Sequence, residues 1–115
     1  MSLRQNKRGG ARLASKLAQI RAALIEAGCD TITKQAAAFG LRRSTTWAAL
    51  NHSRRSGPSA KVVKRILSSS ALPRRARQEG EEYVKEKSRG LYGHTELRAR
   101  AFRDAFQADT RSKAR

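Results

Sequence analysis

The chain has 115 residues, of which 38% are hydrophobic and only 5% aromatic, and it carries a formal net charge of +17 at pH 7. This length allows one small domain with appended segments, and no stretch approaches the roughly 20 apolar residues of a membrane-spanning helix. Cys29 is the only cysteine, which excludes an intrachain disulfide and a cysteine-rich metal site and points to a reducing cytoplasm.

The positive charge is concentrated in the middle of the chain. Residues 31–78, which we call the cationic segment, contain eleven Lys and Arg residues and no acidic residue. Residues 79–115 are nearly balanced in charge. Charge that serves only solubility is normally of mixed sign along a helix, so the cationic segment favours a polyanionic partner that relieves its self-repulsion.

The N-terminal third predicts an arm and one helix. Residues 1–10 are basic and lack apolar periodicity, so we expect a flexible basic arm. Arginine-rich, acid-poor starts are also typical of organelle transit peptides, although these residues equally suit a first helix. Apolar residues then recur at helical spacing over residues 11–27, in the stripe Leu13, Leu17, Ile20 and Leu24. The cations off this stripe are expected to face water or phosphate: Arg12, Lys16 and Arg21.

Two short helices joined at a glycine are predicted next. Thr31 is a suitable N-cap for a helix over residues 32–39. Gly40 follows it, where a left-handed backbone turn tolerates little else. A third helix is expected over residues 43–51. A polar loop closed by Gly57-Pro58 then leads to a fourth helix over residues 59–69, with an apolar face of Val62, Val63, Ile66 and Leu67.

The C-terminal part predicts weaker elements. Pro73 prevents continuation of the fourth helix, and a mixed-charge helix is expected around residues 81–88. Thr95 can cap a last helix, and residues 109–115 are expected to fray. One face of this helix needs a cover, either the domain itself or a second subunit, and comprises Leu97, Ala101, Phe102, Ala105 and Phe106.

These elements together predict an all-α fold, a small bundle of four to six short helices. The domain is expected to cover residues 11–72, and residues 73–115 form a helical extension suited to dimerisation or partner binding.

The third helix has two distinct faces. If Thr46, Ala49 and Leu50 point inward, helical geometry sends a second group of side chains to the opposite face. That group is Arg43, Ser44, Trp47, Ala48 and Asn51. Trp47 has two placements: toward a nucleic-acid groove, or folded back over the hydrophobic seam, where it would bury a large area.

These residues carry a resemblance to a known family. Ala36-x-x-x-Gly40-Leu41, followed by Ser44-Thr45-Thr46 and by Leu50-Asn51, resembles the helix-turn-helix of the lactose-repressor and phage-repressor families. Ser59-Ala60-Lys61 is similar to the entry of the next helix in the lactose-repressor headpiece, and the preceding helix is more similar to the phage-repressor arrangement. The resemblance covers roughly residues 13–70 and leaves the tail unrecognised.

Three positions depart from the family pattern. Gln35 stands where an aliphatic residue is usual, Arg42 where Ser or Thr often caps the recognition helix, and Thr46 where Val or Ile is usual.

The resemblance implies sequence-specific binding of double-stranded DNA by a repressor-like transcription regulator. Arg43 is the first choice for a base contact, most naturally to guanine. The implied base contacts are Arg43, Ser44, Trp47 and Ala48. The implied phosphate contacts are Thr33, Lys34, Arg42, Thr45, Asn51, His52, Arg54, Arg55 and Lys61. A homodimer is expected because one short recognition helix rarely gives enough specificity.

The sequence indicates no cofactor, no metal, no small-molecule ligand and no membrane association. The expected location is the cytoplasm, on the nucleoid if the source is bacterial or phage. An enzyme is not expected, because there is no glycine-rich phosphate loop and neither histidine has a recognisable catalytic partner. Two other readings stay open: a nonspecific architectural nucleic-acid-binding protein that uses charge alone, and an adaptor that docks a partner through its last helix.

Overall fold

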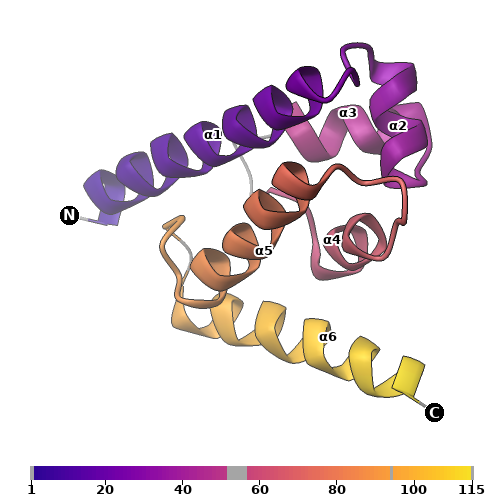
Figure 1. Cartoon of the computed structure of the whole chain (residues 1–115). Coiled ribbons are helices and arrows are strands. Elements are labelled where there is room, and N and C mark those ends of the chain that lie inside the picture. Colours follow the sequence, from indigo (N-terminus) through magenta and orange to yellow (C-terminus); the bar gives the residue numbers. More distant parts are fainter. Residues whose placement is uncertain (1, 52–56, 94, 115) are drawn as a thin grey trace.

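Six helices make up the computed structural model, which describes residues 2–51, 57–93 and 95–114. They are α1 (Ser2–Glu26), α2 (Ile32–Phe39), α3 (Arg43–Asn51), α4 (Ala60–Leu67), α5 (Arg74–Ser88) and α6 (Glu96–Ala114) (Figure 1). The described residues contain no strand, so the predicted all-α fold is confirmed.

The helices enclose one core. α1 packs against α5 and α3, α2 against α3 and α4, and α6 against α4 and α5 (Figure 1). The predicted α1 stripe of Leu13, Leu17, Ile20 and Leu24 is buried in this core. Tyr83 of α5, Tyr92 of the connection after it and Phe102 of α6 belong to the same cluster, so the C-terminal part is an integral layer of the fold.

α1 is longer than predicted. It begins at Ser2, so residues 2–10 are helical where the sequence suggested a flexible arm. Arg, Lys, Gln and Leu in this stretch are good helix formers, and adding a residue to an existing helix is easier than starting one. The absence of apolar periodicity therefore did not exclude a helix. In Figure 1 it projects away from the other helices.

Two cations of α1 do not face water as predicted. Lys16 is only 5% exposed, and its Nζ lies 3.2 Å from Oε1 of Glu79 and 2.5 Å from Oε1 of Glu82, both on α5. Arg21 is half-buried and donates a hydrogen bond to the carbonyl of Leu50 at the end of α3. Packing of α5 and α3 against α1 covers positions that the isolated helix would leave in solvent.

α2 and α3 have the predicted bounds, because both carry local signals. Thr31 caps α2 by accepting a hydrogen bond from the backbone N–H of Lys34 at 3.1 Å. α4 begins one residue later than predicted and ends at Leu67, two residues earlier. Ser59 is its N-cap and accepts from the backbone N–H of Val62.

α5 begins at Arg74, seven residues before the predicted start at 81. Gly80 lies inside it, and glycine in a helix interior costs about 1 kcal/mol relative to alanine. The glycine allows close packing, since a Cβ at this position would lie 3.1 Å from Cδ2 of Leu67 on α4. Tertiary packing thus outweighs a local propensity that argued against a helix.

The predicted apolar face of α6 is only half right. Phe102 is buried and Phe106 is half-buried, but Leu97 is 77% exposed. Ala101 and Ala105 are exposed as well, and Ala99 is buried in their place. The two aromatic rings determine which side of α6 faces the core, since they bury most area. Residues 99, 102 and 106 form the actual face, and α4 and α5 cover it.

The ends of α6 also differ in how well they were predicted. Thr95 caps the helix by accepting from the backbone N–H of Arg98 at 3.2 Å, as expected. The backbone stays helical to Ala114, where fraying from 109 was expected.

A buried lysine connects three parts of this layer. Nζ of Lys87 on α5 donates to the carbonyl of Pro58 at 3.0 Å and to the hydroxyl of Tyr83 at 3.1 Å, and it lies 4.6 Å from the centre of the Phe102 ring. The hydroxyl of Tyr83 donates to the same Pro58 carbonyl at 2.8 Å. Burial lowers the pKa of Lys87 to about 8 and raises that of Tyr83.

Candidate nucleic-acid interface

The connection between α2 and α3 is a three-residue turn built on Gly40. Its φ of 71° and ψ of 34° lie in the left-handed region, which glycine adopts without strain. Its N–H and that of Leu41 both donate to the carbonyl of Ala36, at 2.9 and 3.1 Å. These bonds close the C-terminus of α2 and fix the direction in which α3 leaves it.

The inner face of α3 is the predicted one, because Thr46, Ala49 and Leu50 are buried. A polar Thr46 is tolerated there because its Oγ1 donates to the carbonyl of Arg42 at 2.8 Å. A similar bond explains Gln35, which is 8% exposed and donates through Nε2 to the carbonyl of Cys29 at 3.1 Å. At two positions that differ from the family pattern, the buried polar side chain therefore makes a hydrogen bond to the main chain.

The outer face of α3 is accessible. Arg43, Ser44 and Asn51 are exposed, and Ala48 is half-buried at the edge. Trp47 is 52% exposed, so its ring is not folded back to bury a large area over the hydrophobic seam. Asn51 donates through Nδ2 to the carbonyl of Trp47 at 3.0 Å. The four side chains for which base contacts were predicted thus come from one short helix, and none is enclosed by the core.

The predicted phosphate contacts fall into several groups. Thr33, Arg42 and Lys61 are exposed, and Thr45 is half-buried. Lys34 is exposed but lies 3.2 Å from a carboxylate oxygen of Asp30, and the hydrogen bond from Lys34 lowers the pKa of that carboxyl. Three of the predicted contacts lie outside the described residues: His52, Arg54 and Arg55.

Ion pairing divides the cations of the molecule into two populations. On the side of α1 and α5, Arg12 lies 3.0 Å from Glu86, and Lys16 lies between two further carboxylates. Partial burial opposes ionisation of Glu86, but hydrogen bonds from Arg12 and Tyr92 hold the pKa of its carboxyl below the ordinary value.

The cations near α3 and α4 behave differently. Among the described residues, four of them make no ion pair: Arg42, Arg43, Lys61 and Arg65. The cationic segment contains no carboxylate of its own, and three carboxylates of α5, those of Glu79, Glu82 and Glu86, pair with α1. The positive potential therefore stays unneutralised along α3 and α4, which is the arrangement that attracts phosphate.

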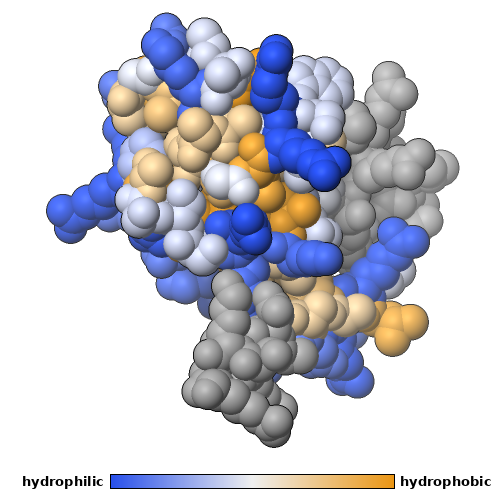
Figure 2. Space-filling model, turned by 90° about the vertical axis from the view of Figure 1, so that its right-hand side faces the viewer, coloured by the Kyte–Doolittle hydropathy of each residue, from blue (hydrophilic) through white to orange (hydrophobic). Residues whose placement is uncertain are grey.

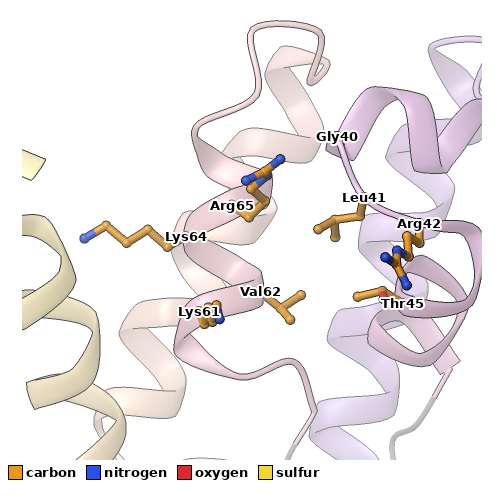
Figure 3. Close-up of a pocket in the computed structure, with 8 residues that line it drawn as sticks. All are labelled: Gly40, Leu41, Arg42, Thr45, Lys61, Val62, Lys64 and Arg65. Carbon is orange, nitrogen blue, oxygen red and sulfur yellow. The ribbon is translucent and has the colours of Figure 1, made fainter.

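A hollow of about 440 Å³ lies between α4 and the turn that precedes α3. Leu41 and Val62 point toward one another across it, while Arg42, Lys61 and Arg65 surround it (Figure 3). Figure 2, which looks onto the side where α2 and α4 lie, shows apolar surface bordered by strongly hydrophilic side chains.

Arg65 was not predicted as a functional residue, nor was the hollow. Arg65 lies four residues after Lys61 on α4, so helical spacing indicates that the two share a face. The apolar floor had no such signal, because Leu41 and Val62 come together only when α4 packs against α2.

Two kinds of feature are absent from the described part of the chain. No three His, Cys, Asp or Glu side chains there come together in a way that would hold a metal ion. None of its helices has the length and apolar character needed to cross a membrane.

Comparisons with protein-family models, with curated proteins and with solved structures gave no match to this chain.

Proposed function

We propose that the protein binds double-stranded DNA sequence-specifically and acts as a repressor-like transcription regulator, with α2 and α3 as its helix-turn-helix and α3 as the recognition helix. The observation that carries this proposal is the outer face of α3. Arg43, Ser44 and Trp47 are accessible there, and they belong to a sequence segment, residues 31–78, that contains no acidic residue.

Two physical requirements of major-groove binding support the proposal. The recognition helix must be held rigidly while its outer face stays open, and the Gly40 turn together with the buried residues of α3 provides this. Cations must also flank the helix to hold the phosphate backbone, and Arg42 and Lys61 are exposed in suitable places.

We also propose that two copies bind paired half-sites, because one helix of nine residues contacts few base pairs. Phe102 is buried and Phe106 half-buried against other helices of the same chain, so the dimer contact is expected to use another surface. Selection of bound duplexes from a random pool would reveal the preferred sequence, and a two-fold symmetric motif is the expected result. An asymmetric single site would contradict the pairing.

Arg43→Ala tests the recognition helix, and Arg100→Ala is its matched control. Both remove one exposed arginine, but Arg100 lies on α6. We expect Arg43→Ala to lower the affinity for the selected duplex by roughly tenfold or more, since a good bidentate base contact is worth about 1–3 kcal/mol. Its effect on random duplex should be no larger than that of the control. Fluorescence anisotropy with both duplexes, at several salt concentrations, measures this.

Two outcomes would contradict the proposal. An equal loss on selected and random duplex would assign Arg43 to phosphate alone, with a salt slope reduced by about one. Failure of the wild-type protein to prefer any duplex from the pool would favour the nonspecific architectural reading.

A further inference from the structure

The hollow between α4 and the α2–α3 turn has two kinds of lining. Its floor consists of Leu41 and Val62, which are half-buried and pack against the hydrophobic core. Its rim carries the exposed cations Arg42, Lys61 and Arg65. The fourth cation of the lining, Lys64, belongs elsewhere: its Nζ points toward α6 and donates to the carbonyl of Phe106 at 3.0 Å (Figure 3).

The combination of linings specifies the chemistry of a ligand. An inorganic anion would engage the rim but leave the apolar floor in contact with water. A neutral apolar molecule would cover the floor but leave three cations without a counter-charge. An aromatic or aliphatic group that bears a carboxylate or phosphate satisfies both, and the hydroxyl of Thr45 offers a further hydrogen bond.

The size agrees with a ligand of this kind. Small-molecule sites typically occupy roughly 300–1,000 Å³ and combine apolar walls with a few polar groups that fix orientation. The hollow, at about 440 Å³, lies near the lower end of this range. We infer that it is a binding site for a small amphipathic anion, with the apolar group on Leu41 and Val62 and the charged group held by Arg65, Lys61 and Arg42.

The hollow is lined by residues that are also proposed to hold DNA, so a ligand bound there would affect DNA binding. Arg42, Thr45 and Lys61 line it and are also proposed phosphate contacts. A bound anion would neutralise them and occupy the space beside α3, so it would compete with a DNA strand. This antagonism rests on the proposed function, whereas ligand binding itself does not.

2-Naphthoate is a suitable probe, with 2-naphthamide as its uncharged analogue. Methyl NMR of the full chain without DNA follows the signals of Leu41 and Val62 during titration. We expect saturable shifts of both methyl groups with naphthoate, with a dissociation constant on the order of 1 mM or tighter, and at least fivefold weaker binding of the amide.

Arg65→Gln and Arg100→Gln form the matched pair of variants. Both arginines are exposed on helices, so neither change should prevent folding. Arg65→Gln should weaken naphthoate binding by about fivefold, the upper end for an exposed charge pair, and Arg100→Gln should leave it unchanged.

Several results would overturn the inference. They are equal affinity for naphthoate and naphthamide, equal binding by the two variants, and shifts that avoid Leu41 and Val62. If naphthoate does not move these methyl signals but duplex DNA does in a separate titration, the hollow is part of the nucleic-acid surface and not a separate site. Because the naphthoate titration contains no DNA, its failure is distinguishable from failure of the Arg43 experiment.

Discussion

Lys87→Met provides the sharpest test of the buried layer between α5 and α6. Lys87 is 5% exposed, and burial lowers the pKa of its ammonium to about 8 from an ordinary value of 10.5. Below pH 8 this group is protonated in both the folded and the unfolded chain, so the folded chain carries the full cost of burying the charge. Between pH 8 and 10.5 the folded protein releases the proton while the unfolded chain retains it.

The free energy of unfolding should therefore rise with pH in this window, because the unfolded state binds more protons. A pKa lowered by about 2.5 corresponds to an increase on the order of 1 kcal/mol between pH 7 and pH 9. The increase should end near pH 10. There the hydroxyl of Tyr83 loses its proton in the unfolded chain but keeps it in the folded one, because burial raises its pKa in the folded protein. Lys87→Met should remove this dependence and be neutral or stabilising at pH 7, because a buried charge is replaced by an apolar group of similar size.

Urea unfolding of both proteins at pH 7, 8 and 9, followed by circular dichroism, measures the two curves. The hydroxyl of Tyr83 still donates to Pro58 in the variant, so that carbonyl keeps a partner. A wild-type stability that stays flat or falls from pH 7 to 9, in parallel with the variant, would refute this account of Lys87. A variant less stable by several kcal/mol at pH 7 would show that the lysine bonds outweigh the cost of burial.

Three further changes probe the framework around the proposed interface. In thermal unfolding, Gly57→Ala should destabilise the protein by about 2 kcal/mol more than Gly28→Ala. Both glycines have positive φ, but only at Gly57 would a Cβ lie 2.8 Å from the hydroxyl of Tyr83. Similar losses of stability in the two variants would refute the predicted clash. Thr46→Val should change stability by less than about 1 kcal/mol, because the carbonyl of Arg42 still accepts a hydrogen bond from the backbone N–H of residue 46. A larger loss of stability would mean that the hydroxyl is essential. Lys16→Met should lower the free energy of unfolding by about 1 kcal/mol, because it removes the counter-charge of two α5 carboxylates. The difference in stability between variant and wild type should shrink at high salt. A difference that salt leaves unchanged would assign the loss to packing.

The parts of the fold that could be predicted are those with signals close in sequence. Thr31, Gly40 and the apolar spacing of α3 define two helices and a turn without reference to the rest of the chain. The bounds of α2 and α3 and the inward set of α3 were therefore correct.

Apart from the helix ends at residues 2–10 and 109–114, the errors concern contacts between residues far apart in sequence. Lys16 looked solvent-exposed because its carboxylate partners lie 63 and 66 residues away. The start of α5 was predicted seven residues too late, because the packing of Gly80 on Leu67 of α4 has no signal in the local sequence. The accessible face of α3 could be predicted from helical geometry, but the hollow could not, since its floor depends on how α4 packs.

The net charge of +17 is unevenly distributed, because residues 31–78 hold eleven cations and no carboxylate, whereas the seven carboxylates of residues 79–115 nearly balance the nine cations there. Among the described residues, Arg43, Lys61 and Arg65 of α3 and α4 make no ion pair, so ion pairing does not weaken their part of the field. In the field of an extended polyanion an uneven charge distribution experiences a torque as well as an attraction, so the molecule approaches in a preferred orientation. Fewer collisions are then wasted in wrong orientations, and this gain disappears as added salt shortens the range of the field.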